Sequence, residues 1–100
     1  MTETDILRLV LFSLGASQTE AARLALEVEA FAKKINPAWT TLDKSDDPGA
    51  KVLVGSLHSP IGRKVAAQYI RMVGNNVLSK SGPSGERLLR DLEFWIVGKN

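Results

Sequence analysis

The sequence predicts an all-α fold, a compact single-domain bundle of four to five helices that spans residues 1–100. Apolar residues recur at helical spacing in several separate segments. Capping residues open these segments, and glycine or proline closes most of them. The chain has 100 residues, of which 44% are hydrophobic and 24% charged, and this composition suits one globular domain with its own core.

The first helix is expected to run to about Leu14. Thr2 or Thr4 can cap it, and Glu3 and Asp5 lie beside its positive end. Apolar side chains cover most of its circumference, so the helix lies in the centre of the core or is partly covered by another chain. These apolar residues are Ile6, Leu7, Leu9, Val10, Leu11, Phe12 and Leu14.

The second helix is expected over residues 18–35, after Gly15 ends the first. Ser17 and Glu20 form a capping box, and Pro37 stops the helix. One face carries apolar residues at the i, i+3, i+4, i+7 spacing of a core-facing helix. These residues are Ala21, Leu24, Ala25, Val28, Phe31, Ala32 and Ile35.

Residues 37–47 are the most loop-like segment, and the residues after them are ambiguous. A valine-rich run favours a strand, which would form a small hairpin within residues 39–57. However, Asp47 and Pro48 are a cap followed by proline at the first helical position, which favours a short helix. Helical spacing also fits the four apolar residues Ala50, Leu53, Val54 and Leu57. We favour the helix and keep the hairpin as the alternative.

A long helix is expected over residues 60–80, opened by Ser59 and Pro60. The segment "SGPSG" predicts a turn after it, and a last helix follows over residues 84–97. The apolar half of the long helix comprises Ile61, Val65, Ala66, Tyr69, Ile70, Met72, Val73 and Val77. In the last helix, Leu88, Leu89, Leu92, Trp95 and Ile96 are expected to face the core.

Several kinds of chemistry lack the residues they need. The sequence has no cysteine and one histidine, His58, and it contains no metalloprotease, phosphate-loop or nucleophile-elbow motif. Asp43, Ser45 and Asp47 resemble a calcium loop only superficially, because Pro48 stands where that loop needs glycine. We therefore expect no enzymatic activity, no catalytic residue, no metal, no cofactor and no small-molecule substrate.

The apolar segment near the N-terminus is not expected to enter a membrane. It follows acidic residues, is interrupted by Arg8, and falls far short of the ~20 residues needed to span a bilayer. The absence of cysteine fits a reducing compartment. We expect a cytoplasmic protein without membrane association.

Charge is distributed unevenly along the chain. Residues 1–50 hold five cations and eight anions, a net charge of −3, whereas residues 51–100 hold eight cations and three anions, a net charge of +5. No acidic residue lies between Asp47 and Glu86. This asymmetry can create a positive patch that attracts phosphate or an acidic partner, unless the two halves pack together and offset one another.

The polar side of the long helix is the main candidate binding site. Lys64, Gln68, Arg71 and Asn75 follow the spacing i, i+4, i+7, i+11, so they project from one side over roughly 16 Å. We call these four residues the basic row. Arg63 and Lys80 are expected to lie alongside and to take part in binding.

A second candidate surface is apolar. Leu26 lies off the core stripe of the second helix, with Ala22 and Ala30 one turn before and after it, and Phe94 lies off the core face of the last helix. Apolar residues that face outward can form a protein interface. We expect these four residues to contact a protein partner or a second copy of the chain.

These features favour a small non-enzymatic binding or regulatory protein of the adaptor or inhibitor type. It acts through protein–protein contacts, can self-associate, and engages an anionic partner through its basic long helix. The alternative is a nucleic-acid-binding protein, because the basic row carries side chains that contact phosphates and base edges. The short helix, turn and long helix of residues 48–80 also give the outline of a helix-turn-helix.

Overall fold

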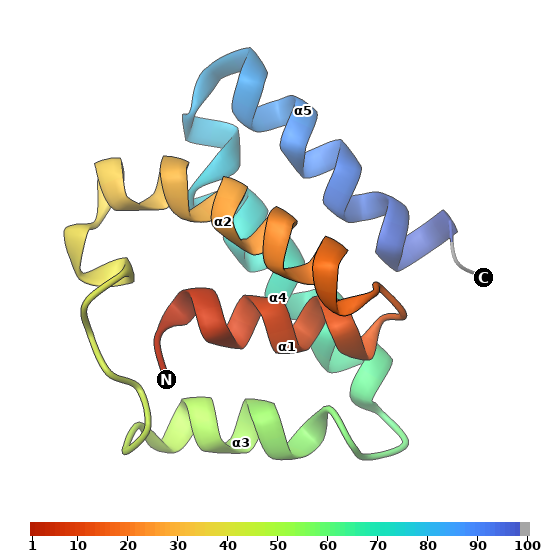
Figure 1. Cartoon of the computed structure of the whole chain (residues 1–100). Helices are drawn as coiled ribbons and strands as arrows, with labels where there is room; N and C mark the ends of the chain where they lie inside the picture. The colour runs from red at the N-terminus through yellow and green to blue at the C-terminus, as the bar shows by residue number, and fades with distance from the viewer. Residues whose placement is uncertain (99–100) are drawn as a thin grey trace.

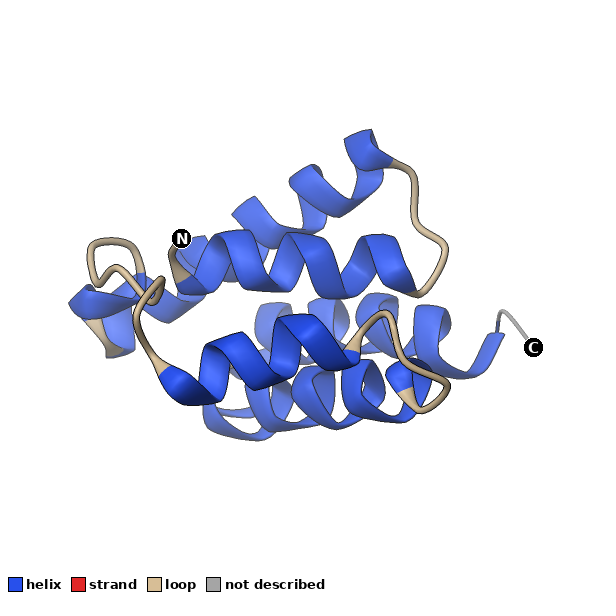
Figure 2. Ribbon diagram, turned by 90° about the horizontal axis from the view of Figure 1, so that it is seen from below, coloured by secondary structure: helices blue, strands red, loops and turns tan. Residues whose placement is uncertain are grey.

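The computed structural model describes residues 1–98 and shows an all-α bundle of five helices, as predicted. Its helices are α1 (Glu3–Ser13), α2 (Gln18–Ile35), α3 (Pro48–Ser56), α4 (Gly62–Asn76) and α5 (Gly82–Glu93) (Figure 1). Two 3-10 turns, η1 (Pro37–Trp39) and η2 (Leu78–Lys80), flank the loops, and a π-helical turn, η3 (Phe94–Gly98), extends α5. No strand occurs within residues 1–98 (Figure 2), so the hairpin alternative is wrong.

The first helix lies at the centre of the bundle. In Figure 1, α1 runs between α2 and α3 with α4 behind it, and it packs against all three of these helices. Its nearly all-apolar surface is therefore covered within the chain, and only Leu9 and Phe12 among its apolar residues keep substantial exposure. The side chains it buries are Ile6, Leu7, Val10 and Leu11, with Leu14 following at the helix end.

Local capping explains why the first three α-helices begin where the sequence predicts. Thr2 and Asp5 form a reciprocal capping box at α1. Ser17 accepts a hydrogen bond from the Glu20 amide at α2, although the reciprocal bond of the predicted box is absent from residues 1–98. Asp47 accepts from the amide three residues later and opens α3. Each carboxylate or hydroxyl satisfies an amide that the helix itself leaves unpaired.

The long helix is shorter than predicted at both ends. Ser59 does not cap it: its hydroxyl donates to the Ser56 carbonyl at the end of α3, and α4 begins only at Gly62. At the other end α4 stops at Asn76, and the chain tightens into η2, where the Ser79 hydroxyl donates to the carbonyl of Asn75. Hydroxyls that bond nearby carbonyls compete with continuation of a helix.

The predicted turn at "SGPSG" is largely the first turn of α5. Gly82 has a φ of +76°, which suits glycine, and the helix starts at that residue. Three residues later, Gly85 lies so close to η2 that a Cβ atom would come within 2.4 Å of the Leu78 carbonyl oxygen. The absence of a side chain at Gly85 therefore lets α5 pack against η2.

Three apolar residues that were predicted to face the core are instead exposed. Ile35 is 48% exposed, Ile61 57% and Met72 50%. Ile35 is the last residue of α2, and Ile61 precedes the first residue of α4, so neither is enclosed by a further turn of helix on both sides. Met72 lies at the edge of the buried face of α4, beside a groove described below.

A polar cluster links α1, α4 and the loop before α3. The Tyr69 hydroxyl donates to Glu3 Oε2 at 2.5 Å, and Lys44 Nζ lies 2.9 Å from Glu3 Oε1. Burial, and then the hydrogen bond to Glu3, raise the pKa of the Tyr69 phenol far above its usual range. The hydrogen bond to Glu3 also raises the pKa of Lys44. The carboxylate of Glu3 thus holds both partners in their protonated forms.

The packing of Gly85 predicts opposite effects for two alanine substitutions. Gly85→Ala should lower the free energy of unfolding by about 1–3 kcal/mol, because the new methyl group overlaps backbone atoms of η2. Gly55→Ala in α3 meets open space and should leave stability unchanged or raise it by up to about 1 kcal/mol. Urea denaturation followed by circular dichroism measures both. Equal stability of the Gly85→Ala variant and the wild type would contradict the packing.

Tyr69 predicts a specific pH dependence of stability. Its pKa is raised in the folded chain, so its stabilising contribution is complete below the unfolded pKa of about 10 and declines as pH rises above that value. Tyr69→Phe should lose about 1–3 kcal/mol at neutral pH, because the hydrogen bond to Glu3 is gone. The difference in the free energy of unfolding between the variant and the wild type should narrow above pH 10 by about 1.4 kcal/mol per pH unit.

Urea denaturation of both proteins between neutral pH and pH 11 tests this convergence. The sequence contains one tyrosine, so the absorbance of the tyrosinate ion reports Tyr69 alone. A stability gap that stays constant with pH, or a tyrosinate signal that appears at the usual pH in the folded chain, contradicts the assignment.

Candidate partner-binding surface

The basic row lies on the outward face of α4. The opposite face of this helix is buried, with Ala66, Ile70 and Val73 in the core, and α4 packs against α1. Because the row lies about half a turn away from these residues, it is turned to solvent. Its four members, Lys64, Gln68, Arg71 and Asn75, are all exposed.

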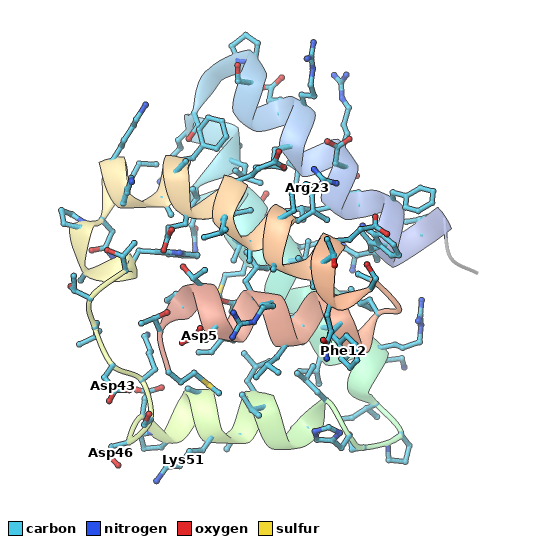
Figure 3. All side chains as sticks on the ribbon, in the orientation of Figure 1. Asp5, Phe12, Arg23, Asp43, Asp46 and Lys51 are labelled. Carbon is cyan, nitrogen blue, oxygen red and sulfur yellow. The ribbon has the colours of Figure 1, made fainter. Side chains whose placement is uncertain are left out.

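The cations of the basic row are not neutralised by ion pairs. Within residues 1–98, no carboxylate oxygen lies within 4.0 Å of the side-chain nitrogens of Lys64 or Arg71. Two acidic residues of the first half, Asp43 and Asp46, are on the loop before α3 (Figure 3), and a third, Glu3, is bound to Lys44 and Tyr69. Glu93 of α5 lines the same hollow as Arg71 and Asn75.

The two flanking cations differ in their placement. Arg63 lies in the first turn of α4, directly before Lys64, and is exposed. Lys80 is also exposed but belongs to η2, because α4 ends at Asn76. Lys80 is therefore not an extension of the helical row, which runs along α4 from Lys64 to Asn75.

The predicted apolar interface residues lie on two elements, α2 and the π-helical turn η3 after α5. Leu26 is 58% exposed on α2, Ala30 is exposed and Ala22 is half-buried. Phe94 is 53% exposed but lines a hollow between the first turns of α2 and the end of α5, and its ring meets Trp95 edge to face at 5.4 Å. None of the three α2 residues lines that hollow.

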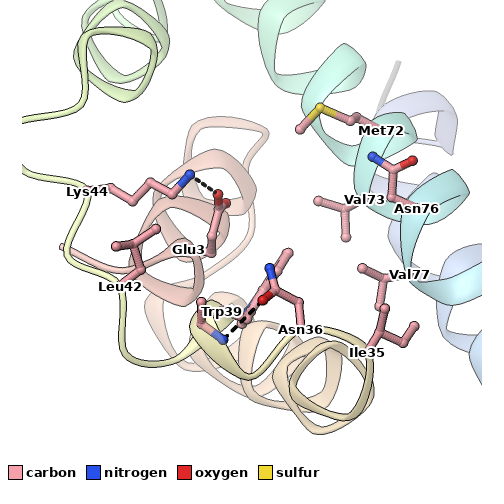
Figure 4. Close-up of a pocket in the computed structure, with 11 residues that line it drawn as sticks. Glu3, Ile35, Asn36, Trp39, Leu42, Lys44, Met72, Val73, Asn76 and Val77 are labelled. Carbon is pink, nitrogen blue, oxygen red and sulfur yellow. Dashed lines mark hydrogen bonds and ion pairs between the residues drawn. The ribbon is translucent and has the colours of Figure 1, made fainter.

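A groove that the sequence did not reveal lies beside the C-terminal half of α4. It encloses about 310 Å³, the lower end of the range typical of ligand pockets. Figure 4 shows side chains of α4 facing Leu42 and Lys44 across the opening, with Trp39 between them. Its lining residues are Glu3, Ile35, Asn36, Ala38, Trp39, Leu42, Lys44, Met72, Val73, Asn76 and Val77.

The polar groups of the groove are few. The ion pair of Lys44 with Glu3 forms part of one wall, and the Asn36 side-chain oxygen accepts from the Ala38 amide. Trp39 is only 8% exposed, and its Nε1 has no hydrogen-bond partner within the described residues. We call this site the Trp39 groove.

The single clue to the groove in the sequence is Trp39 itself. A tryptophan in an otherwise polar, loop-like segment indicates that the segment is packed against something. Its neighbours in the groove come from α1, α2 and α4, and periodicity within one helix does not predict which helix ends lie together. Periodicity alone predicts Ile35 and Met72 to be core residues, because it does not show where a neighbouring element stops covering the helix.

Other kinds of site find no support in the described part of the chain. No three histidine or acidic side chains of residues 1–98 are grouped so that they could hold a metal ion. None of the helices in those residues is both long and apolar enough to cross a bilayer. His58 is exposed at the end of α3.

Comparisons with known proteins add no relative from which a function could be inferred. The sequence matches no family model, no curated protein matches it, and a search of the solved structures finds no match.

Proposed function

We propose that the protein is a small non-enzymatic binding or regulatory protein whose α4 contacts an acidic protein partner. The observation that carries this proposal is the exposure of Lys64 and Arg71 on one helix face, without a carboxylate in salt-bridge range among residues 1–98. Charges that are not paired within a chain remain available to attract a complementary surface and to orient it.

The surroundings of the row favour a protein over a nucleic acid. Met72, which follows Arg71 on α4, and Ile61, the residue before α4, are at least half exposed. Protein interfaces combine a desolvated apolar centre, rich in methionine and arginine, with a polar rim. Self-association would use other exposed apolar residues, namely Leu26 and Phe94.

The alternative partner is a nucleic acid. The row combines lysine and arginine, which bind phosphates, with glutamine and asparagine, which can pair with adenine edges. This composition is the specific observation that favours it.

Charge reversal of the row tests the proposal. The double variant Lys64→Glu, Arg71→Glu should lose the acidic proteins that the immobilised wild type captures from a host lysate at physiological salt. The matched control Lys51→Glu, Arg87→Glu changes the net charge equally at exposed positions on α3 and α5 and should retain them. The row variant should unfold at the wild-type urea concentration, because both positions are exposed.

The same captures distinguish the two kinds of partner. Nuclease treatment should leave the captured material unchanged for a protein partner and remove it for a nucleic acid. For DNA, the logarithm of the affinity should fall with the logarithm of salt concentration by about 0.9 for each phosphate contact. Identical captures by the wild type and by the row variant contradict both readings of the row.

A further inference from the structure

We infer that the Trp39 groove receives an apolar side chain of the same acidic protein partner that contacts the basic row. This inference rests on the proposed function and adds the location and chemistry of the partner's anchor. The partner segment would carry one bulky apolar residue with carboxylates beside it. The groove and the row would then be two parts of one contact surface.

The groove and the row are continuous along α4. Met72 and Asn76 line the groove, and they directly follow Arg71 and Asn75 of the row in the sequence. Consecutive residues of a helix lie about 100° apart around its axis, so these pairs lie on adjoining strips of the surface. A segment that contacts Arg71 therefore needs to cross only Met72 to enter the groove.

The walls of the groove suit an apolar group. Leu42 is 53% exposed, and Ile35 and Met72 are exposed to a similar degree, so three large apolar side chains surround the opening. Val73 and Val77 from the core and the ring of Trp39 form its floor. Burial of apolar surface that is now exposed to water provides the driving force.

The charges around the groove favour carboxylates beside that anchor. Lys33 and Lys34 are exposed in the last turn of α2, directly before Ile35, and neither forms a salt bridge within residues 1–98. Three acidic groups across the groove have partners: Glu3 is held by Lys44 and Tyr69, Asp43 by the α-amino group of Met1, and Asp47 accepts a hydrogen bond from the Ala50 amide. On the α2 side of the groove the charge without a salt bridge is therefore positive, whereas the exposed Asp46 lies on the loop before α3.

This charge also disfavours a second copy of the chain as the occupant. A symmetric dimer centred on α4 would bring Lys64 and Arg71 of one copy towards the same residues of the other. Like charges brought together in an interface are destabilising. A nucleic acid supplies negative charge but no aliphatic anchor for a groove lined mainly by apolar side chains.

Selection from a random-peptide phage library provides a defined probe. The wild-type chain is immobilised at physiological salt, and the most enriched peptide is synthesised and titrated against variants by fluorescence polarisation. We expect enriched peptides to carry a bulky apolar residue flanked by aspartate or glutamate. Lys64→Glu combined with Arg71→Glu should weaken their binding by about tenfold or more.

Leu42→Lys separates the groove from simple charge attraction. An added cation strengthens binding of an acidic peptide if only charge matters, whereas it weakens binding by about tenfold if Leu42 must be buried against the anchor. The control Val52→Lys adds the same charge at an exposed apolar position on α3, outside the groove, and should not weaken binding. Circular dichroism verifies that both variants fold.

The indole resonances provide a second readout that needs no substitution. The sequence has two tryptophans, and peptide binding should shift the Nε1–H signal of Trp39 and leave that of Trp95, which does not line the groove. One outcome would refute the groove as a binding site and leave the proposed function intact. In that outcome, acidic peptides depend on the row, bind the Leu42→Lys variant as tightly as the Val52→Lys variant, and leave the Trp39 signal unshifted. A library that yields no acidic ligand, or ligands indifferent to the row variant, contradicts both.

Discussion

Four aliphatic side chains of α1, Ile6, Leu7, Val10 and Leu11, are almost completely removed from water, and the rest of the fold is arranged around them. Burial of each leucine, isoleucine or valine contributes about 1.5–3 kcal/mol, and α1 contributes four such residues to the core before Leu14. A helix that is apolar on nearly every side has to be covered on every side. α2, α3 and α4 provide this cover. The orientation of α4 follows, because its apolar face must meet α1 and its basic row must therefore face water.

Hydrophobic burial alone does not determine how each helix is rotated about its axis or shifted along it. The polar cluster around Glu3 adds a directional constraint. Its hydrogen bonds to Tyr69 and Lys44 join the start of α1 to the middle of α4 and to the loop before α3. A half-buried carboxylate is costly to leave unpaired, so alternative packings that break these bonds are disfavoured. The same cluster forms one wall of the Trp39 groove, and stability and the shape of the groove are therefore coupled.

Much of the fold could be predicted from local signals. Caps at Thr2, Ser17 and Asp47 and apolar periodicity gave the class, the order of the helices and the exposure of the basic row, since each depends on neighbours in the sequence. The errors at helix starts occur where contacts with the end of the preceding element decide. Ser59 bonds to α3 instead of capping α4, and the start of α5 depends on how closely Gly85 approaches η2.

The candidate site could also be predicted only in part. Outward projection of Lys64 and Arg71 follows from helical geometry, whereas the groove depends on how the end of α2, η1 and α4 meet around Trp39. Ile35 and Met72 are exposed because of how these elements pack, although their spacing in the sequence is that of core residues. Hydrophobic pattern shows which face of a helix is apolar, but neighbouring elements determine how far along the helix that face is covered.

The electrostatic potential at the surface of α4 can be measured directly. Nuclear magnetic resonance with cationic and anionic nitroxide cosolutes compares the relaxation that each causes at individual protons. Protons of Lys64, Gln68 and Arg71 should relax faster with the anionic cosolute, and those of the acidic loop around Asp46 with the cationic one. Equal relaxation by both cosolutes along the basic row would mean that Glu93 and other carboxylates cancel its charge, and the proposed contact surface would lose its physical basis.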